Sequence, residues 1–218
     1  YLVSDHDPAW GQVEDPARDK HPLTAEILQV LSADSGQRIA DIGAGPGYFT
    51  AKLAARVGSE GQVFATDIDP EGVEMLRNLR DKTPTENITV APATRNDIGL
   101  PGDANPDAIL IVNVYTFWQA EKDAARDIFE QYHRALRCAG RIVLFQRTVV
   151  DCRWSGRFRL QDCEGMSAQT LEEIADAVGF HAEPDPRTLH HALAGGRGSP
   201  REEGSGSGHV GAPRKVCR

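Results

Sequence analysis

Short apolar runs alternate with helically spaced apolar residues along most of this chain. The runs predict strands at residues 38–42, 62–67, 87–91, 108–114 and 141–150. Apolar residues three or four positions apart predict helices that begin at Pro22, Phe49, Pro70 and Lys122 and after Ser167. This alternation predicts an α/β fold, a Rossmann-like doubly wound sheet with helices on both faces. Ligands of such sheets bind at the carboxyl ends of the strands.

The two ends of the chain depart from this pattern. Residues 1–21 are polar and interrupted by prolines, which predicts an irregular arm before a domain at 22–193. Residues 194–218 are rich in glycine and serine and nearly lack large apolar side chains, so we expect a disordered tail. Only 180–183 and 189–193 remain for the last two strands, which leaves open whether the sheet is complete at its C-terminal edge.

Composition narrows the class of protein modestly. The 218 residues are 40% hydrophobic and 26% charged, as is ordinary for one globular domain, and no apolar run approaches the roughly 18 residues of a membrane span. The net charge of −8 argues against nucleic acid as the main partner. We expect a cytoplasmic protein, although a chain that begins at Tyr1 also allows an exported form. Its oligomeric state leaves no trace in the sequence.

The cysteines carry no recognisable metal pattern. None of the four, Cys138, Cys152, Cys163 and Cys217, belongs to a CxxC pair, and no His flanks them at zinc spacing. We therefore expect reduced thiols rather than a metal site or a disulfide.

The stretch IADIGAGPGYFT joins the first predicted strand to a helix. Gly43, Gly45 and Gly47 allow the backbone to approach a ligand closely, and the helix N-terminus supplies free N–H groups that suit a phosphate or a carboxylate. The dinucleotide fingerprint GxGxxG would require glycine at the position of Tyr48, which disfavours NAD.

Two acids flank this loop. Asp67 ends the second predicted strand, where a carboxylate can accept hydrogen bonds from ribose hydroxyls. Asp41 precedes the glycines, where it would repel a pyrophosphate but suit the ammonium group of an amino-acid cofactor. Asp41 could instead cap the N–H groups of its own loop. The arrangement favours the methionine half of S-adenosylmethionine.

Several stretches resemble the class I S-adenosylmethionine-dependent methyltransferases. RIADIGAGPGYFTAKLAARVG and QVFATDIDPEGVEMLRNLR resemble the first motif of the family and the acidic motif that follows it. LPGDANPDAILIVNVYTFW and RALRCAGRIVLFQ resemble the fourth strand and the turn before the fifth. The resemblance runs from about residue 16 to 180. It is greatest to the methyltransferase type 11 group, which includes the ubiquinone/menaquinone-biosynthesis methyltransferases.

The resemblance implies roles for particular residues. Asp41 and the loop residues Gly43, Ala44, Gly45 and Gly47 would surround the methionine moiety of S-adenosylmethionine. The remaining cofactor contacts would be Asp67 at the ribose, Ile68 on the adenine, Asn96 or Asp97 near the adenine amino group, and Asn113 with Val114 at the sulfonium. The arm segment DPARDKH would close over the cofactor.

The catalytic group and the methyl acceptor stay open. Many relatives carry His where Thr116 and Phe117 stand, so no general base is assigned. Side chains near the expected site that could act as a base or shape a pocket are Asp15, His21, Tyr48, Tyr115, Phe117 and Trp118. The acidic charge and the lack of an added recognition domain favour a small-molecule acceptor. A non-catalytic S-adenosylmethionine-binding or scaffold protein, and an NAD-dependent oxidoreductase, are the alternatives.

Overall fold

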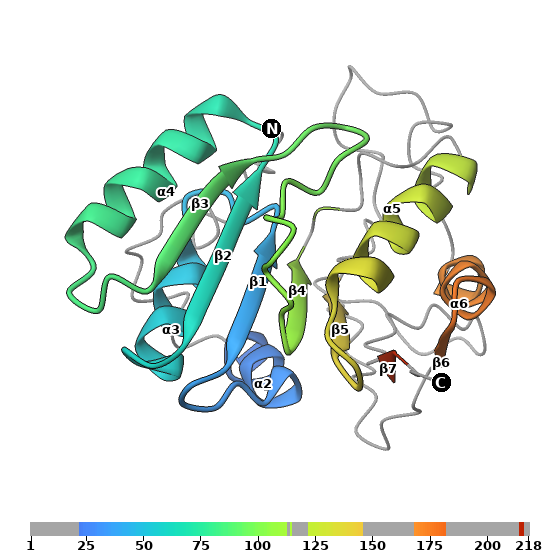
Figure 1. The fold of residues 1–218 in the computed structure, drawn as a ribbon, viewed down its shortest axis with the longest axis horizontal. Coiled ribbons are helices and arrows are strands. Elements are labelled where there is room, and N and C mark those ends of the chain that lie inside the picture. Colours follow the sequence, from blue (N-terminus) through green and yellow to red (C-terminus); the bar gives the residue numbers. More distant parts are fainter. Residues whose placement is uncertain (1–21, 113, 115–121, 146–167, 182–213, 216–218) are drawn as a thin grey trace, which may run out of the picture.

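A computed structural model describes residues 22–112, 114, 122–145, 168–181 and 214–215. Within them, helices and strands alternate through most of the chain, as the sequence predicts (Figure 1). The helices are α2 (Pro22–Leu31), α3 (Tyr48–Val57), α4 (Pro70–Lys82), α5 (Lys122–Ala135) and α6 (Ala168–Ala177). The strands are β1 (Arg38–Ile42), β2 (Gln62–Asp67), β3 (Ile88–Pro92), β4 (Ala108–Val112), β5 (Arg141–Phe145), β6 (Phe180–His181) and β7 (Arg214–Lys215).

The strands form one sheet in the order β3-β2-β1-β4-β5-β7-β6. Strands β1 to β5 are mutually parallel, and β7 pairs antiparallel with both β5 and β6. The order reverses between β1 and β4, so a crevice for a ligand is expected at the carboxyl ends of these two strands. This arrangement confirms the predicted doubly wound α/β fold.

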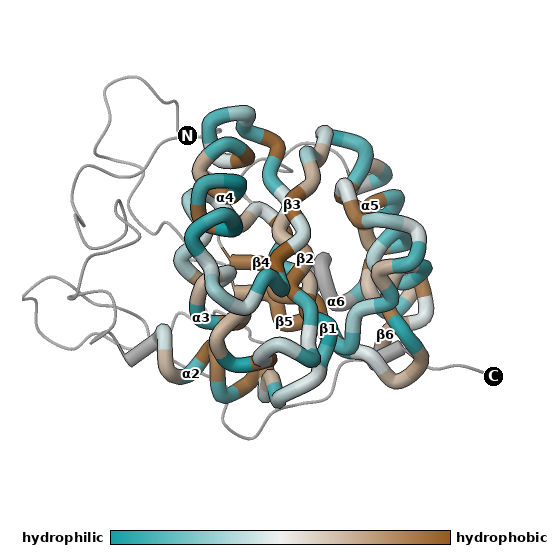
Figure 2. Tube along the Cα trace, turned by 60° about the vertical axis from the view of Figure 1, so that its left-hand side comes forward, coloured by the Kyte–Doolittle hydropathy of each residue, from teal (hydrophilic) through white to brown (hydrophobic). Residues whose placement is uncertain are grey.

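Helices cover both faces of the sheet. Ile27 of α2, Leu53 of α3 and Leu76 of α4 pack with one set of strand side chains, whereas Phe129 of α5 and Ile174 of α6 pack with the alternate set. Figure 2 shows the hydrophobic strands β4 and β5 between helices with hydrophilic segments. The four buried positions of β4, residues 108–111, explain its nearly continuous apolar run.

In the described part of the chain, the C-terminal edge of the sheet consists of two short strands. Strands β6 and β7 contain two residues each. The last strand is formed by Arg214–Lys215, within the tail for which the sequence predicts disorder, and the expected strand at 189–193 lies outside the described residues. Backbone pairing to β5 and β6 orders these two residues despite the polar composition around them.

The expectation of reduced thiols is wrong for Cys138. This residue follows α5 and is disulfide-bonded. Spacing patterns identify zinc motifs, but a disulfide depends on which segments the fold brings together, and sequence spacing gives no such information.

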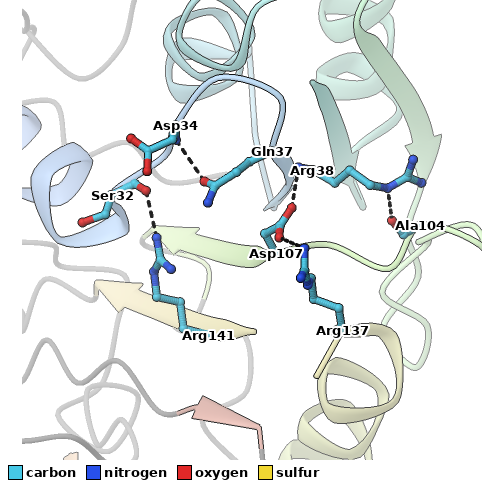
Figure 3. Close-up of polar contacts among 8 residues, drawn as sticks. All are labelled: Ser32, Asp34, Gln37, Arg38, Ala104, Asp107, Arg137 and Arg141. Carbon is cyan, nitrogen blue, oxygen red and sulfur yellow. Dashed lines mark hydrogen bonds and ion pairs between the residues drawn. The ribbon is translucent and has the colours of Figure 1, made fainter. Parts of the chain in front are cut away.

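A polar cluster joins elements at the amino end of the sheet (Figure 3). The Asp107 carboxylate accepts a hydrogen bond from the backbone N–H of Arg38 at 2.8 Å and pairs with the guanidinium of Arg137. The Arg38 side chain donates to the carbonyl of Ala104 at 2.7 Å, and Arg141 donates to the carbonyl of Ser32 at 2.9 Å. These contacts fix the starts of β1, β4 and β5 at the end opposite to the expected ligand crevice.

Replacing Asp107 with alanine is expected to lower the free energy of unfolding by about 1 to 2 kcal/mol, because the part-buried N–H of Arg38 loses its acceptor. Arg137 adds little, since its side chain is 59% exposed. Asp103→Ala is the matched control, because Asp103 is exposed and contributes only a backbone carbonyl. Urea unfolding of both variants measures the difference, and equal losses would contradict this role for the carboxylate.

Candidate functional site

The candidate site lies at the carboxyl ends of β1 and β2, marked by their arrowheads in Figure 1. The loop after β1 carries the three glycines, Asp67 ends β2, and Ile68 follows it. Ile68 is 55% exposed, which is unusual for a large apolar side chain beside a buried strand. In a nucleoside site, an exposed apolar side chain can pack on the flat base. A buried carboxylate beside it can accept hydrogen bonds from the hydroxyls of the attached sugar.

The glycine loop adopts a backbone that few other residues tolerate. Gly43, Gly45 and Gly47 all have positive φ, at 66°, 54° and 92°. A Cβ at Gly43 would lie 2.3 Å from the side chain of Val114, so this loop passes close to the segment just after β4, which ends at Val112. The N–H of Ala44 donates to the carbonyl of Thr66 at 2.9 Å, which ties the loop to β2. These contacts hold the backbone of the loop close to the ends of the strands, directly before α3.

Asp41 is the buried acid of β1. Its side chain is 2% exposed, and its Oδ2 accepts a hydrogen bond of 2.6 Å from the hydroxyl of Thr50, in the first turn of α3. A buried carboxylate is costly unless hydrogen bonds compensate its lost hydration. The structure therefore brings Asp41 together with α3, a contact that the sequence analysis did not anticipate.

Asp67 is the buried acid of β2, with 5% exposure. Its Oδ2 accepts from the N–H of Gly45 at 2.6 Å, and its Oδ1 accepts from the N–H of Asp69 at 2.8 Å. A Cβ on Gly72 of α4 would lie 3.2 Å from the carboxylate carbon of Asp67. Glycine at this position therefore avoids a tight contact with the Asp67 side chain. An ionised carboxylate offers about four acceptor positions, so two further donors, such as ribose hydroxyls, can still be accommodated.

The loop after β3 lies beside the end of β2, because the N–H of Ala93 donates to the carbonyl of Asp67 at 2.8 Å. Thr94 and Asp97 pair as an isolated bridge, and the Asp97 carboxylate accepts from the N–H of Gly99 at 2.9 Å. Gln131 of α5 holds this loop, because its amide nitrogen donates to the carbonyl of Asn96 at 2.8 Å and its amide oxygen accepts from the N–H of Ile98 at 3.2 Å. The side chains of Asn96 and Asp97 remain exposed.

The structure thus brings together most of the predicted site residues. Those it gathers at this end of the sheet are Asp41, Gly43, Ala44, Gly45, Gly47, Asp67 and Ile68, with Asn96 and Asp97 on the adjacent loop. Asn113 and the candidates at 15, 21, 115, 117 and 118 lie outside the described residues.

Tyr48 belongs to the core rather than to an open site. It is 3% exposed, its ring contacts Phe49 edge to face at 5.1 Å, and its hydroxyl lies 3.1 Å from the hydroxyl of Thr24. The side chain therefore joins α3 to α2.

Thr50, Gly72 and Gln131 are the residues that sequence reasoning missed. Each acts on a predicted site residue or on its loop from another element of the fold. The one signal available for Thr50 was a threonine in the first turn after the glycine loop, which is also common in helices without such a contact. Within the described ranges, no three His, Cys, Asp or Glu side chains gather as a metal site would require.

The sheet order, the glycine loop after β1 and the acid at the end of β2 define a nucleotide-cofactor site of the Rossmann-like class. A family model described as a methyltransferase domain matches residues 39–140. A ubiquinone/menaquinone biosynthesis C-methyltransferase from Shewanella frigidimarina is 30% identical over 184 residues, covering 76% of this chain and 68% of that protein. The chain belongs to the class I S-adenosylmethionine-dependent methyltransferases, a family of enzymes, and S-adenosylmethionine is its cofactor.

Other similarities agree with the family and differ in the acceptor that their names imply. A protein-L-isoaspartate O-methyltransferase from Methanococcoides burtonii is 32% identical over 92 residues, covering 42% of this chain and 45% of that protein. The alignments with this and two further curated relatives span 32–46% of those proteins' own lengths. A solved S-adenosylmethionine-dependent methyltransferase from Aquifex aeolicus shares the fold, with a TM-score of 0.63 and 20% identity over 78% of this chain and 86% of its own.

The described residues fit the cofactor. S-adenosylmethionine carries a nucleoside and a zwitterionic amino-acid group, both of which suit hydrogen-bonding carboxylates, and two buried acids, Asp41 and Asp67, lie on adjacent strands. The N-terminus of α3, directly after the glycine loop, adds backbone N–H groups that suit a carboxylate.

None of the helices in the described ranges is long and apolar enough to cross a membrane.

Proposed function

We propose that this chain transfers a methyl group from S-adenosylmethionine to a small-molecule acceptor. The observation that carries the proposal is the pair of buried acids, Asp41 and Asp67, on adjacent strands beside a glycine loop with positive φ. The net charge of −8 supports a small acceptor over nucleic acid. The Shewanella relative, named as a C-methyltransferase of quinone biosynthesis, supports the same class.

The proposed roles follow from the chemistry of each group. Asp67 accepts the ribose hydroxyls, Ile68 packs on the adenine, and Asn96 or Asp97 lies at the adenine edge. Asp41 receives the cofactor's ammonium group, while N–H groups at the start of α3 receive its carboxylate, because those of Ala44, Gly45 and Gly47 already bond within the protein. Asn113 and the arm at 1–21 are proposed to complete the site at the sulfonium and over the cofactor.

The chain's contribution to the reaction is mainly alignment. When bound, S-adenosylmethionine would supply a methyl group activated by its sulfonium: the acceptor atom bonds to the methyl carbon as the carbon–sulfur bond breaks, and S-adenosylhomocysteine is the leaving group. The protein has to hold the acceptor atom about 3 Å from that methyl group and to exclude water. Anchoring both ends of the cofactor, at Asp41 and at Asp67, fixes the direction in which the methyl group points.

Two experiments test the proposal in sequence. Calorimetry should first detect binding of S-adenosylhomocysteine and no binding of NADH, whereas the reverse result would overturn the proposal. The protein is then incubated with S-adenosylmethionine labelled in its methyl group and a panel of phenols, hydroquinones and amines, an isoaspartyl peptide and RNA. Label in a small molecule supports the proposal. If the label appears only in the peptide or only in RNA, the acceptor is a protein or a nucleic acid, and the proposed small-molecule acceptor is wrong.

A non-catalytic role is the second candidate function. It is motivated by Thr116 and Phe117, which stand where many relatives carry a histidine. A binding or scaffold protein would take up S-adenosylhomocysteine but label nothing in the panel. Transfer of label to any acceptor would exclude it.

A further inference from the structure

A buried hydroxyl holds the acid of β1. Thr50 is fully buried and donates to Oδ2 of Asp41 at 2.6 Å, within the short range expected for a hydroxyl bound to a carboxylate. The two residues lie on different elements, β1 and α3, at either end of the glycine loop. The contact therefore fixes the strand end, the loop and the first helical turn relative to one another.

The hydroxyl of Thr50 reaches out of its own helix. Thr50 is in the first turn of α3, and its hydroxyl donates to Asp41 on β1 rather than to a backbone carbonyl nearby in the chain. Its β-branched side chain has few rotamers, so the position of the hydroxyl is well defined. The hydrogen bond therefore gives the Asp41 carboxylate a donor at a well-defined position.

Burying the Asp41–Thr50 pair costs more desolvation free energy than a purely structural contact would require. Asp41 and Thr50 are 2% and 0% exposed, and a pair of apolar residues of the same shape would fill this space without desolvating a charge. A carboxylate held at this place can serve a ligand that carries a positive charge. At the end of β1, that place adjoins the loop proposed to bind the amino-acid half of the cofactor.

We propose that Thr50 is a positioning residue that aims the Asp41 carboxylate at the ammonium group of S-adenosylmethionine. The inference rests on the proposed function, because it takes Asp41 as the partner of the ammonium group. Asp67, at the end of the neighbouring strand, accepts hydrogen bonds from the ribose hydroxyls instead. The two acids then recognise separate halves of one cofactor, and Thr50 serves only the amino-acid half.

This division gives a test that a general structural role would not pass. S-adenosylhomocysteine contains both halves, whereas 5′-methylthioadenosine contains the nucleoside without the ammonium and carboxylate groups. Thr50→Val keeps the shape of the side chain and removes the hydroxyl. It should raise the Kd of S-adenosylhomocysteine about tenfold to a hundredfold, the usual effect of losing one hydrogen bond to a charged group, and change the Kd of 5′-methylthioadenosine less than twofold.

Three further variants complete the calorimetric comparison. Thr50→Ser should return the Kd of S-adenosylhomocysteine to within about threefold of the original, because it restores the donor. Asp41→Asn should show the same selective loss as Thr50→Val, and it serves as the test if the valine variant does not fold. Asp67→Asn should weaken both ligands.

Two outcomes would overturn the inference. If Thr50→Val weakens both ligands equally, the hydroxyl only maintains the shape of the site. If it weakens neither, Thr50 does not orient Asp41 for binding. Failure of the unsubstituted protein to bind S-adenosylhomocysteine is a separate result, which removes the proposed function and this inference with it.

Discussion

Asp67→Asn is expected to weaken the binding of S-adenosylhomocysteine by about a hundredfold. A hydrogen bond to a charged group contributes about 1.5 to 3 kcal/mol, and a tenfold change in Kd corresponds to about 1.4 kcal/mol. The asparagine side chain keeps the shape of Asp67 but has one acceptor oxygen in place of two. Its amide group cannot serve both the backbone N–H groups of Gly45 and Asp69 and a pair of ribose hydroxyls.

The matched control for this variant is Asp69→Asn. It makes the same change of charge two residues further along the chain, where the Asp69 side chain accepts from the N–H of Glu71 and caps α4. Asparagine caps helices about as well as aspartate, so stability and affinity should both stay near their original values. Calorimetric titration of both variants decides the matter. Comparable losses of affinity would mean that net negative charge, not the Asp67 carboxylate, governs binding.

Gly99→Ala is expected to lower the free energy of unfolding by about 2 to 5 kcal/mol. Gly99 has a φ of +74°, which costs other residues about 1 to 2 kcal/mol. Its Cβ would also lie 2.5 Å from the carbonyl oxygen of Pro92, a backbone atom that cannot rotate away, and overpacking of this kind adds about 1 to 3 kcal/mol. The N–H of Ala93, next to Pro92, donates to the carbonyl of Asp67, so the affinity for S-adenosylhomocysteine should fall as well.

Two other glycines separate the causes of this effect. Gly36 has a φ of +80° but no atom within 4 Å of an added Cβ, so Gly36→Ala measures backbone strain alone. Gly102 also has open space around its Cβ and has no positive φ, so Gly102→Ala should change the unfolding free energy by less than about 0.5 kcal/mol. Urea unfolding should rank the losses as Gly99, then Gly36, then Gly102. A loss at Gly99 no larger than that at Gly36 would contradict the close approach.

Local patterns predicted the secondary structure well because each pattern has a local physical cause. The apolar run at 108–114 predicted a buried strand, and β4 ends at Val112. Pro70 predicted the start of a helix, and α4 begins there, with the Asp69 side chain as its cap. The third strand was predicted at 87–91 and is Ile88–Pro92, where Pro92 is tolerated because β3 is an edge strand of the sheet.

Predictions failed where the outcome depended on segments far apart in the sequence. Strand β7 lies in a polar tail, and its two residues are ordered only by pairing with β5 and β6. The disulfide of Cys138 likewise depends on the tertiary fold, because no local pattern decides which two cysteines meet. No helical or strand periodicity encodes either contact.

The sequence by itself determined the alternation of strands and helices, the glycine loop and the two acids, since periodicity, turn chemistry and residue type are local properties. From these features the class of the cofactor could be inferred. Only the tertiary structure decided how the acids are held: Thr50 on Asp41, Gly45 and Gly72 around Asp67, and Gln131 across the loop at 94–98. Those contacts arise when packing of the hydrophobic faces brings separate elements together, and the orientation of a buried side chain is fixed only then.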